Sequence, residues 1–210
     1  MKTKIYLFLL LMNIGTAAVA QEQKMSDAEI AAFKQDVNVV SKKIKTLSTD
    51  FVQYKHLDFL SKDIETSGKM IFKEPGLLHW QYKKPYNYSI VFKSGKILIN
   101  DEGKKSAVDI GNSKIFGRIN KLIVGSVSGN MFDEKEFTIS YFKLKGQNLA
   151  KFIPKDATLK KYIKQIELTF DKEEATVVQV KLLESSEDYT RIVLKNKVIN
   201  AKIDDSVFTN

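Results

Sequence analysis

Residues 67–100, SGKMIFKEPGLLHWQYKKPYNYSIVFKSGKILIN, decide the fold of this chain. Large apolar residues take every second position there and turns with Pro or Gly separate the runs; the alternating residues are Met70, Phe72, Leu78, Trp80, Tyr82, Tyr86, Tyr88, Ile90 and Phe92. Such alternation is typical of antiparallel strands with one buried face. The stretch therefore predicts a sheet with a broad apolar face rich in aromatic rings. Because the chain supplies few helices to cover that face, the sheet is suited to holding something hydrophobic.

The first twenty residues have the three parts of a secretory signal peptide. Lys2 and Lys4 supply positive charge, residues 5–14 form a short apolar run, and Ala18-Val19-Ala20 is a small-residue cleavage site. The apolar run is too short for a transmembrane anchor, which needs about 20 residues. We therefore expect cleavage after Ala20 and one secreted domain over residues 21–210, an ordinary length for a single domain.

The composition limits the classes of partner. Once the signal peptide is removed, 32 basic and 25 acidic residues give a net charge of +7, and the lysines are scattered along the chain. A nucleic-acid-binding face needs clustered basic residues with aromatic rings among them, so we expect no nucleic-acid partner. The charge favours a solvated surface or a weak attraction to anionic membranes. With no Cys, the chain depends on an apolar core for its stability.

The rest of the chain predicts one helix followed by many strands. Ser26 and Glu29 form a capping box, and apolar residues at helical spacing follow it, which predicts a helix to about Thr46. Short strands begin at Phe51, resume at residue 136, and end with separate strands at 190–194 and 197–203, and residues 154–164 predict one or two helical turns. This pattern favours an antiparallel sheet, a sandwich or a barrel.

A second helical region is predicted over residues 113–128, where apolar residues stand three and four positions apart. Gly117 and Gly125 interrupt it, and each weakens a helix by up to about 1 kcal/mol relative to Ala. Two interpretations stay open. The segment is either a soft helix that moves over a cavity, or a helix that covers the core and uses its glycines for close packing.

Side chains that usually carry catalysis or bind metals are sparse. His56 and His79 are the only histidines, neither has a partner at metal-ligand spacing, and we expect His79 to be a surface or edge residue. Residues 125–129 read GSVSG, whereas a nucleophile elbow needs Ser at the centre, where Val127 stands. Neighbouring carboxylates lie in predicted turns instead of converging across a cleft. The sequence therefore predicts a protein that is not an enzyme and that binds no metal and no cofactor.

Four stretches resemble a known family, and together they cover essentially the whole chain after the leader. They are LSTDFVQ at 47–53, GKMIFKEP at 68–75 with LHWQY at 78–82 and KP at 84–85, IVFKSGKILIN at 90–100, and FIPK at 152–155 leading into IEL at 166–168. The second and third are the most specific, because turn prolines, aromatic residues and glycine follow in the same order. In these stretches the chain resembles the periplasmic outer-membrane lipoprotein carrier proteins, the LolA family.

The resemblance implies a mainly β (α+β) fold, an unclosed antiparallel β-barrel (half-barrel) with a helical lid over an apolar cavity. It implies a monomeric periplasmic carrier that accepts triacylated lipoproteins from an inner-membrane ABC-type lipoprotein release complex and passes them to an outer-membrane acceptor. The acyl chains would lie in the cavity, without a cofactor. Each buried CH₂ contributes about 0.8 kcal/mol, so the carrier must offer an apolar volume comparable to the membrane interior.

The inward positions of the predicted strands are the candidate residues of the acyl-chain cavity. They are Phe51, Met70, Phe72, Leu78, Trp80, Tyr82, Tyr88, Ile90, Phe92, Ile97 and Ile99. The candidate lid residues come from the second helical region and are Ile115, Phe116, Ile119, Leu122 and Ile123. Each strand residue fits a cavity wall and a packed core equally well, because both lie on the same face.

One position departs from the family's pattern. Family members often carry an Arg just before the first turn proline, as a latch for the lid, and this chain has Glu74 there. Lys73 is one residue away and points to the opposite face of its strand, so a latch must be built differently. The departure leaves two alternatives open on the same fold. One is an envelope regulator that senses lipids or lipoproteins, and the other is a carrier of another lipidic cargo.

Overall fold

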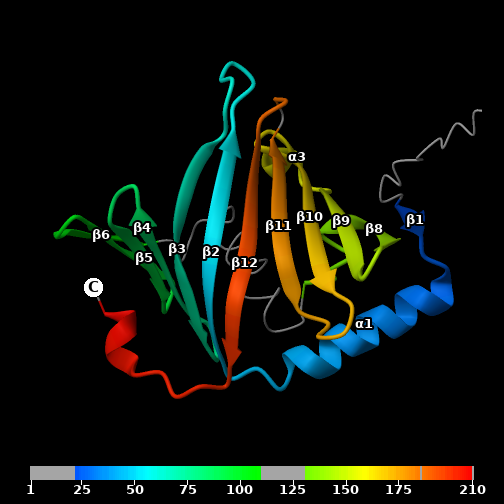
Figure 1. The fold of residues 1–210 in the computed structure, drawn as a ribbon, viewed down its shortest axis with the longest axis horizontal. Coiled ribbons are helices and arrows are strands. Elements are labelled where there is room, and N and C mark those ends of the chain that lie inside the picture. Colours follow the sequence, from blue (N-terminus) through cyan, green and yellow to red (C-terminus); the bar gives the residue numbers. More distant parts are fainter. Residues whose placement is uncertain (1–21, 110–130, 185, 210) are drawn as a thin grey trace, which may run out of the picture.

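The computed structural model describes residues 22–109, 131–184 and 186–209, which form a twelve-stranded antiparallel sheet, a long helix and two short helical segments (Figure 1). The strands are β1 (Gln23–Lys24), β2 (Thr46–His56), β3 (Ile64–Lys73), β4 (Leu77–Lys84), β5 (Tyr88–Lys93), β6 (Lys96–Asp101), β7 (Lys104–Asp109), β8 (Phe137–Leu144), β9 (Gln147–Pro154), β10 (Ile163–Asp171), β11 (Val177–Glu184) and β12 (Tyr189–Ile199). The helical segments are α1 (Asp27–Ser41), α3 (Ala157–Lys160) and the 3-10 turn η1 (Asp205–Phe208). The signal peptide expected over residues 1–20 and the helix expected over residues 113–128 lie outside the described residues.

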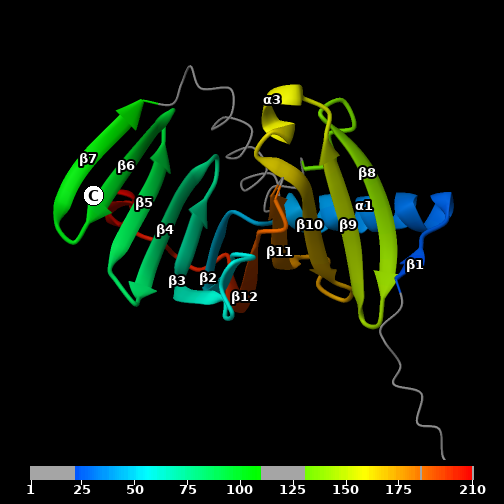
Figure 2. The ribbon, with the colours of Figure 1, turned by 90° about the horizontal axis from the view of Figure 1, so that it is seen from above.

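The sheet is open. Its strand order is β1-β8-β9-β10-β11-β12-β2-β3-β4-β5-β6-β7, and among the described strands β1 and β7 are edges that do not pair with each other. Figure 2 shows the sheet bending at β2 and β12 into two wings, β3–β7 and β8–β11. The strand pattern allowed a sheet, a sandwich or a barrel, and the structure confirms the unclosed antiparallel sheet that the resemblance implied.

Helix α1 begins where the sequence predicted and ends earlier. The capping box is present: Ser26 N–H donates to Glu29 Oε2 (2.9 Å), and Glu29 N–H donates to Ser26 Oγ (3.4 Å). The prediction that the helix runs to Thr46 was wrong, because it ends at Ser41 and Thr46 is the first residue of β2. Asn200 Oδ1 accepts from Lys45 N–H (2.7 Å), which directs the chain out of the helix and into the sheet.

The core consists of two apolar clusters on the concave side of the sheet. One lies under β8–β11 against α1 and is centred on Phe33, Phe152 and Phe170. The other lies under β2–β4 and consists of Ile44, Leu47, Phe51, Met70, Phe72 and Leu78. Val40 and Leu194 pack against both clusters, so the two wings share one apolar interior.

The C-terminal segment covers part of the opposite, convex face. Turn η1 packs against β4 and β5, and the side chains of Phe208 and Val91 are fully buried. Lys73 holds this segment by donating to Asp205 Oδ1 (2.5 Å) and to the carbonyl oxygen of Ile203 (3.3 Å). The expectation of a surface or edge residue at His79 is wrong for the edge, because β4 lies between β3 and β5. The His79 side chain is half-buried, and burial lowers the pKa of its imidazole.

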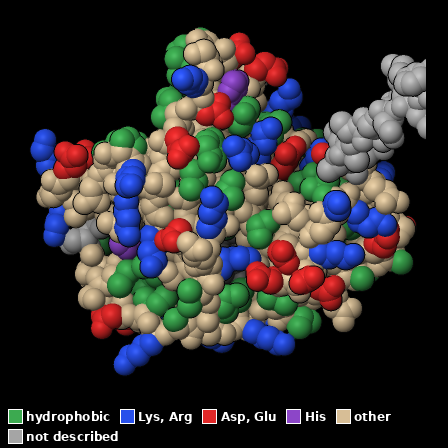
Figure 3. Space-filling model, in the orientation of Figure 1, with side chains coloured by type: hydrophobic (Ala, Val, Ile, Leu, Met, Phe, Trp, Pro, Cys, Tyr) green, Lys and Arg blue, Asp and Glu red, His purple; other side chains and the backbone are tan. Residues whose placement is uncertain are grey.

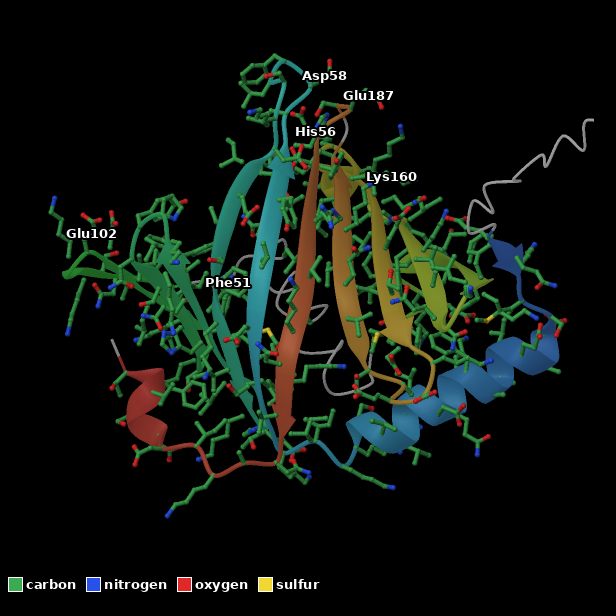
Figure 4. All side chains as sticks on the ribbon, in the orientation of Figure 1. Phe51, His56, Asp58, Glu102, Lys160 and Glu187 are labelled. Carbon is green, nitrogen blue, oxygen red and sulfur yellow. The ribbon has the colours of Figure 1, made fainter. Side chains whose placement is uncertain are left out.

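The far end of the sheet carries two turns that are tied together. Asp58 N–H, after β2, donates to Asp188 Oδ1 (2.9 Å), before β12, and His56 Nδ1 lies 2.9 Å from Asp63 Oδ1. Figure 4 shows His56, Asp58 and Glu187 gathered at this end. Over the face of the molecule drawn in Figure 3, basic and acidic side chains are interspersed. No helix in the described part of the chain is both long enough and apolar enough to cross a membrane.

Candidate functional site: an apolar cavity between the two wings

A cavity of about 280 Å³ lies on the concave side of the sheet, between the two wings and the C-terminal half of α1. Sites for small molecules usually measure about 300–1,000 Å³, so its volume is just below that range. Its described wall is formed by Val37, Val40, Ser41, Ile44, Leu47, Gln53, Met70, Leu78, Trp80, Tyr82, Ile90, Phe92, Ile163, Ile166, Leu168, Ala175, Thr176, Val177, Val180, Leu182, Ile192, Leu194, Lys197 and Ile199. The wall is therefore overwhelmingly apolar.

Six of the eleven candidate cavity residues line this space. They are Met70, Leu78, Trp80, Tyr82, Ile90 and Phe92. The register explains why they meet: Met70 pairs with Trp80, and Trp80 pairs with Ile90, so one row of the pleated sheet carries all three on the same face. That these side chains bind acyl chains stays a prediction.

The other five candidates lie on the same face and do not line the described cavity. Phe51 and Phe72 are each 1% exposed and belong to the packed core. Tyr88, Ile97 and Ile99 follow the register into β5 and β6, farther along the wing. The five candidate lid residues, Ile115 to Ile123, lie outside the described residues. Tyr86, which the alternation placed with the apolar face, precedes β5 and is 50% exposed.

Half of the described wall comes from β10, the turn after it, β11 and β12, and this half was missed. Ile166 and Leu168 of β10 are among its most buried side chains. Alternation at period two in Ile166, Leu168 and Phe170 was a signal that could have found them. Val37 and Val40 of α1 also line the cavity, so the stripe of the helix is part of the wall.

A glycine allows the aromatic layer behind the wall to form. A Cβ on Gly68 would lie 1.8 Å from the carbonyl oxygen of Gln81 and 2.8 Å from Cζ of Phe51. Glycine at this position lets the ring of Phe51 lie over β3 while β4 stays in register. Phe51 then stacks on Trp80 at 4.2 Å between ring centroids and meets Tyr82 edge-on at 5.4 Å. Figure 4 places Phe51 about half-way along β2, near the middle of the sheet.

The cavity has two polar spots. At one, the Tyr82 hydroxyl donates to Gln53 Oε1 (3.2 Å), and burial raises the pKa of the Tyr82 phenol above its ordinary value. At the other, Lys197 Nζ on β12 lies 2.6 Å from Glu174 Oε2 and also donates to Thr176 Oγ1. No group of acidic, His or Cys residues suited to a metal ion occurs among the described residues.

The residue at the family's latch position forms a surface ion pair. Glu74 Oε2 lies 2.5 Å from Lys45 Nζ, and their side chains are 48% and 64% exposed. Neighbouring Lys73 points to the convex face, where it holds Asp205. Exposed pairs contribute about 0–1 kcal/mol, so the Glu74 pair joins the α1–β2 connection to the β3–β4 turn only weakly.

The fold and the cavity together define a class. An open antiparallel sheet curved around an apolar cavity, with no metal cluster in the part described, is suited to binding a hydrophobic ligand. The model of the family called outer membrane lipoprotein carrier protein LolA matches residues 42–210. The chain belongs to this family. No curated protein sequence matches it.

The chain is also similar, at low identity, to several solved structures. A LolA superfamily protein from Nitrosomonas europaea is 7% identical, with 84% of this chain and 97% of that chain covered and a TM-score of 0.45. The lipoprotein LppX from Mycobacterium tuberculosis is 10% identical, with 85% and 100% covered and a TM-score of 0.47. The MucA/MucB complex from Pseudomonas aeruginosa gives 11% identity, 85% and 60% coverage and a TM-score of 0.49.

Proposed function

We propose that the protein is a periplasmic carrier that holds the acyl chains of lipoproteins in the cavity between its two wings. It takes triacylated lipoproteins from an inner-membrane ABC-type release complex and delivers them to an outer-membrane acceptor. Membership of the LolA family supports this role, and the apolar wall of the cavity is the observation that carries it.

The apolar character of the wall supports such a cargo on thermodynamic grounds. An acyl chain leaves a membrane at a cost of about 0.8 kcal/mol per CH₂, so a carrier must replace nearly all of that apolar contact. Trp80 and Phe92 from one wing and Leu168 from the other line one space. Since the chains only need to be shielded from water and later released, no bond-making step and no cofactor are required.

Binding of a synthetic triacylated lipopeptide tests the proposal. Residues 21–210 are mixed with the lipopeptide in detergent, the detergent is removed, and the products are separated by size. A soluble one-to-one complex is the expected result. Lipopeptide that sediments as aggregate while the folded protein elutes alone would contradict the proposal. The same mixture with the unacylated peptide is the control, and it should give no complex.

A further inference from the structure

Lys197 enters the cavity wall through a β-bulge in β12. Pairing of β12 with β2 is regular up to Lys195 opposite Asp50 and resumes at Val198 opposite Ser48, with Asn196 at φ +53° between them. Leu194 and Ile199 are five positions apart, and a regular strand would put them on opposite faces, yet both line the cavity. Bulges re-aim side chains in this way, and here the extra residue directs Lys197 inward.

The side chain of Lys197 is mostly buried. It is 12% exposed, and Lys197 is the only Lys or Arg among the described residues that line the cavity. Taking a charge out of water costs free energy unless hydrogen bonds and an opposite charge compensate for it. A cavity that shielded only hydrocarbon would be better served by an apolar residue at this position.

Lys197 and Thr176 already form a two-donor site for a carboxylate oxygen. Glu174 Oε2 accepts from Lys197 Nζ (2.6 Å) and from the Thr176 hydroxyl (3.1 Å). Both donors line the cavity, whereas Glu174 comes from the β10–β11 turn, does not line it, and is 59% exposed. The exposed carboxylate of Glu174 is thus replaceable by an anionic group that approaches from the cavity.

We propose that Lys197 and Thr176 bind the anionic end of an amphiphile whose hydrocarbon chain lies in the cavity. The shared ligand chemistry is a carboxylate or a phosphate attached to an acyl or alkyl chain, and its oxygen takes the place of Glu174 Oε2. The inference rests on the proposed function insofar as the cavity must accept hydrocarbon chains. It adds that the protein prefers chains with an anionic end to neutral ones.

Three ligands of equal chain length test this preference: laurate, dodecyl phosphate and neutral methyl laurate. Their affinities are measured below their micelle concentrations by displacement of a neutral fluorescent probe. Charge-assisted hydrogen bonds are stronger than neutral ones, so the wild type should bind at least one anionic ligand about tenfold more tightly than methyl laurate. A preference for laurate, for dodecyl phosphate or for both identifies the anionic group.

Amino-acid substitutions test whether Lys197 causes the preference for anionic ligands. Lys197→Gln should remove it, so that laurate and dodecyl phosphate bind no more tightly than methyl laurate, because the charge-assisted bond is lost. Glu174→Gln, which weakens the internal competitor, should strengthen laurate binding. Lys195→Gln is the matched control, since Lys195 is exposed and two residues away. Thermal unfolding of each variant verifies that it is folded.

Each remaining outcome is decisive. Equal affinities for all three ligands in the wild type, or a preference that persists in Lys197→Gln, would overturn the Lys197 assignment and leave the carrier proposal standing. Failure of every ligand to bind, methyl laurate included, would overturn both proposals.

Discussion

The indole of Trp80 stacks on the ring of Phe51, with 4.2 Å between ring centroids and 30° between ring planes. Trp80 faces the cavity, and Phe51 lies behind it with 1% of its side chain exposed. The pair therefore forms two layers, a ligand-facing surface and the packed core that supports it. Stacked aromatic pairs contribute about 0.5–1.5 kcal/mol beyond their area burial, so this contact fixes the position of the wall.

Replacing Trp80, the ligand-facing residue of this pair, tests whether the cavity binds acyl chains. Trp80→Glu puts a carboxylate into the apolar wall, and we expect acyl-chain affinity to fall more than tenfold, a loss of over about 1.4 kcal/mol. Lipopeptide binding is the measurement. Val39→Glu is the matched control, because Val39 is on α1 but 46% exposed and outside the cavity wall. Unchanged lipopeptide binding by a folded Trp80→Glu variant would refute the assignment of this wall.

Replacing Gly68 tests how tightly β3 packs against Phe51 and β4. Gly68→Ala forces β3 away from Gln81 and Phe51, and overpacking of this kind costs about 1–3 kcal/mol. Urea unfolding should show this loss. Gly76→Ala, whose Cβ would meet nothing within 4 Å, should leave the free energy of unfolding nearly unchanged. Equal stability of the two variants would show that the sheet adapts freely at Gly68.

The alternating pattern predicted the face of each wall residue but not its depth. Period two put Met70, Trp80 and Phe92 on one face of the sheet, and these three side chains line the cavity. It assigned Phe51 and Phe72 to the same wall, although both are core, because depth depends on which side chains of other elements cover a position. A sequence pattern in one strand contains no information about that covering.

Other features were set by contacts between distant segments. Strand β12 was predicted as two strands, 190–194 and 197–203, because its bulge depends on pairing with β2, more than a hundred residues earlier. Turn η1 was missed because, beside its Asp204 cap, it is held by distant contacts of the buried Phe208 and of Lys73. The end of α1 at Ser41 likewise depends on Asn200, far along the chain.

The C-terminal segment is expected to contribute strongly to stability. Phe208 is fully buried on the convex face, and Phe→Ala changes in cores cost about 3–5 kcal/mol. We expect Phe208→Ala to lower the free energy of unfolding in urea by an amount of this order while lipopeptide binding is retained. Thr209→Ala, at an exposed neighbour, is the control. A variant as stable as the wild type would show that the segment is not anchored by this side chain.

The lowered pKa of Glu29 predicts that the protein loses stability in acid. The Lys143 ammonium and the Ser26 hydrogen bonds lower the pKa of Glu29 from 4.5 to about 2. A carboxyl with a lowered folded-state pKa stabilises the fold above its unfolded pKa and loses that effect as pH falls through its folded pKa. The stability difference between the wild type and Glu29→Gln should be full above pH 4.5 and vanish toward about pH 2. Glu65→Gln is the control, and a pH-independent difference for Glu29→Gln would contradict the linkage.

The most direct test of the central claim is a release assay. Purified residues 21–210 are added to energised spheroplasts of the source bacterium, and the soluble fraction is examined for lipoproteins, with Trp80→Glu in parallel. The account predicts lipoprotein in a soluble one-to-one complex with the wild type and little or none with Trp80→Glu. If the folded wild type releases no lipoprotein, although it binds free acyl chains, then the protein is not a lipoprotein carrier and its cavity serves another lipidic ligand.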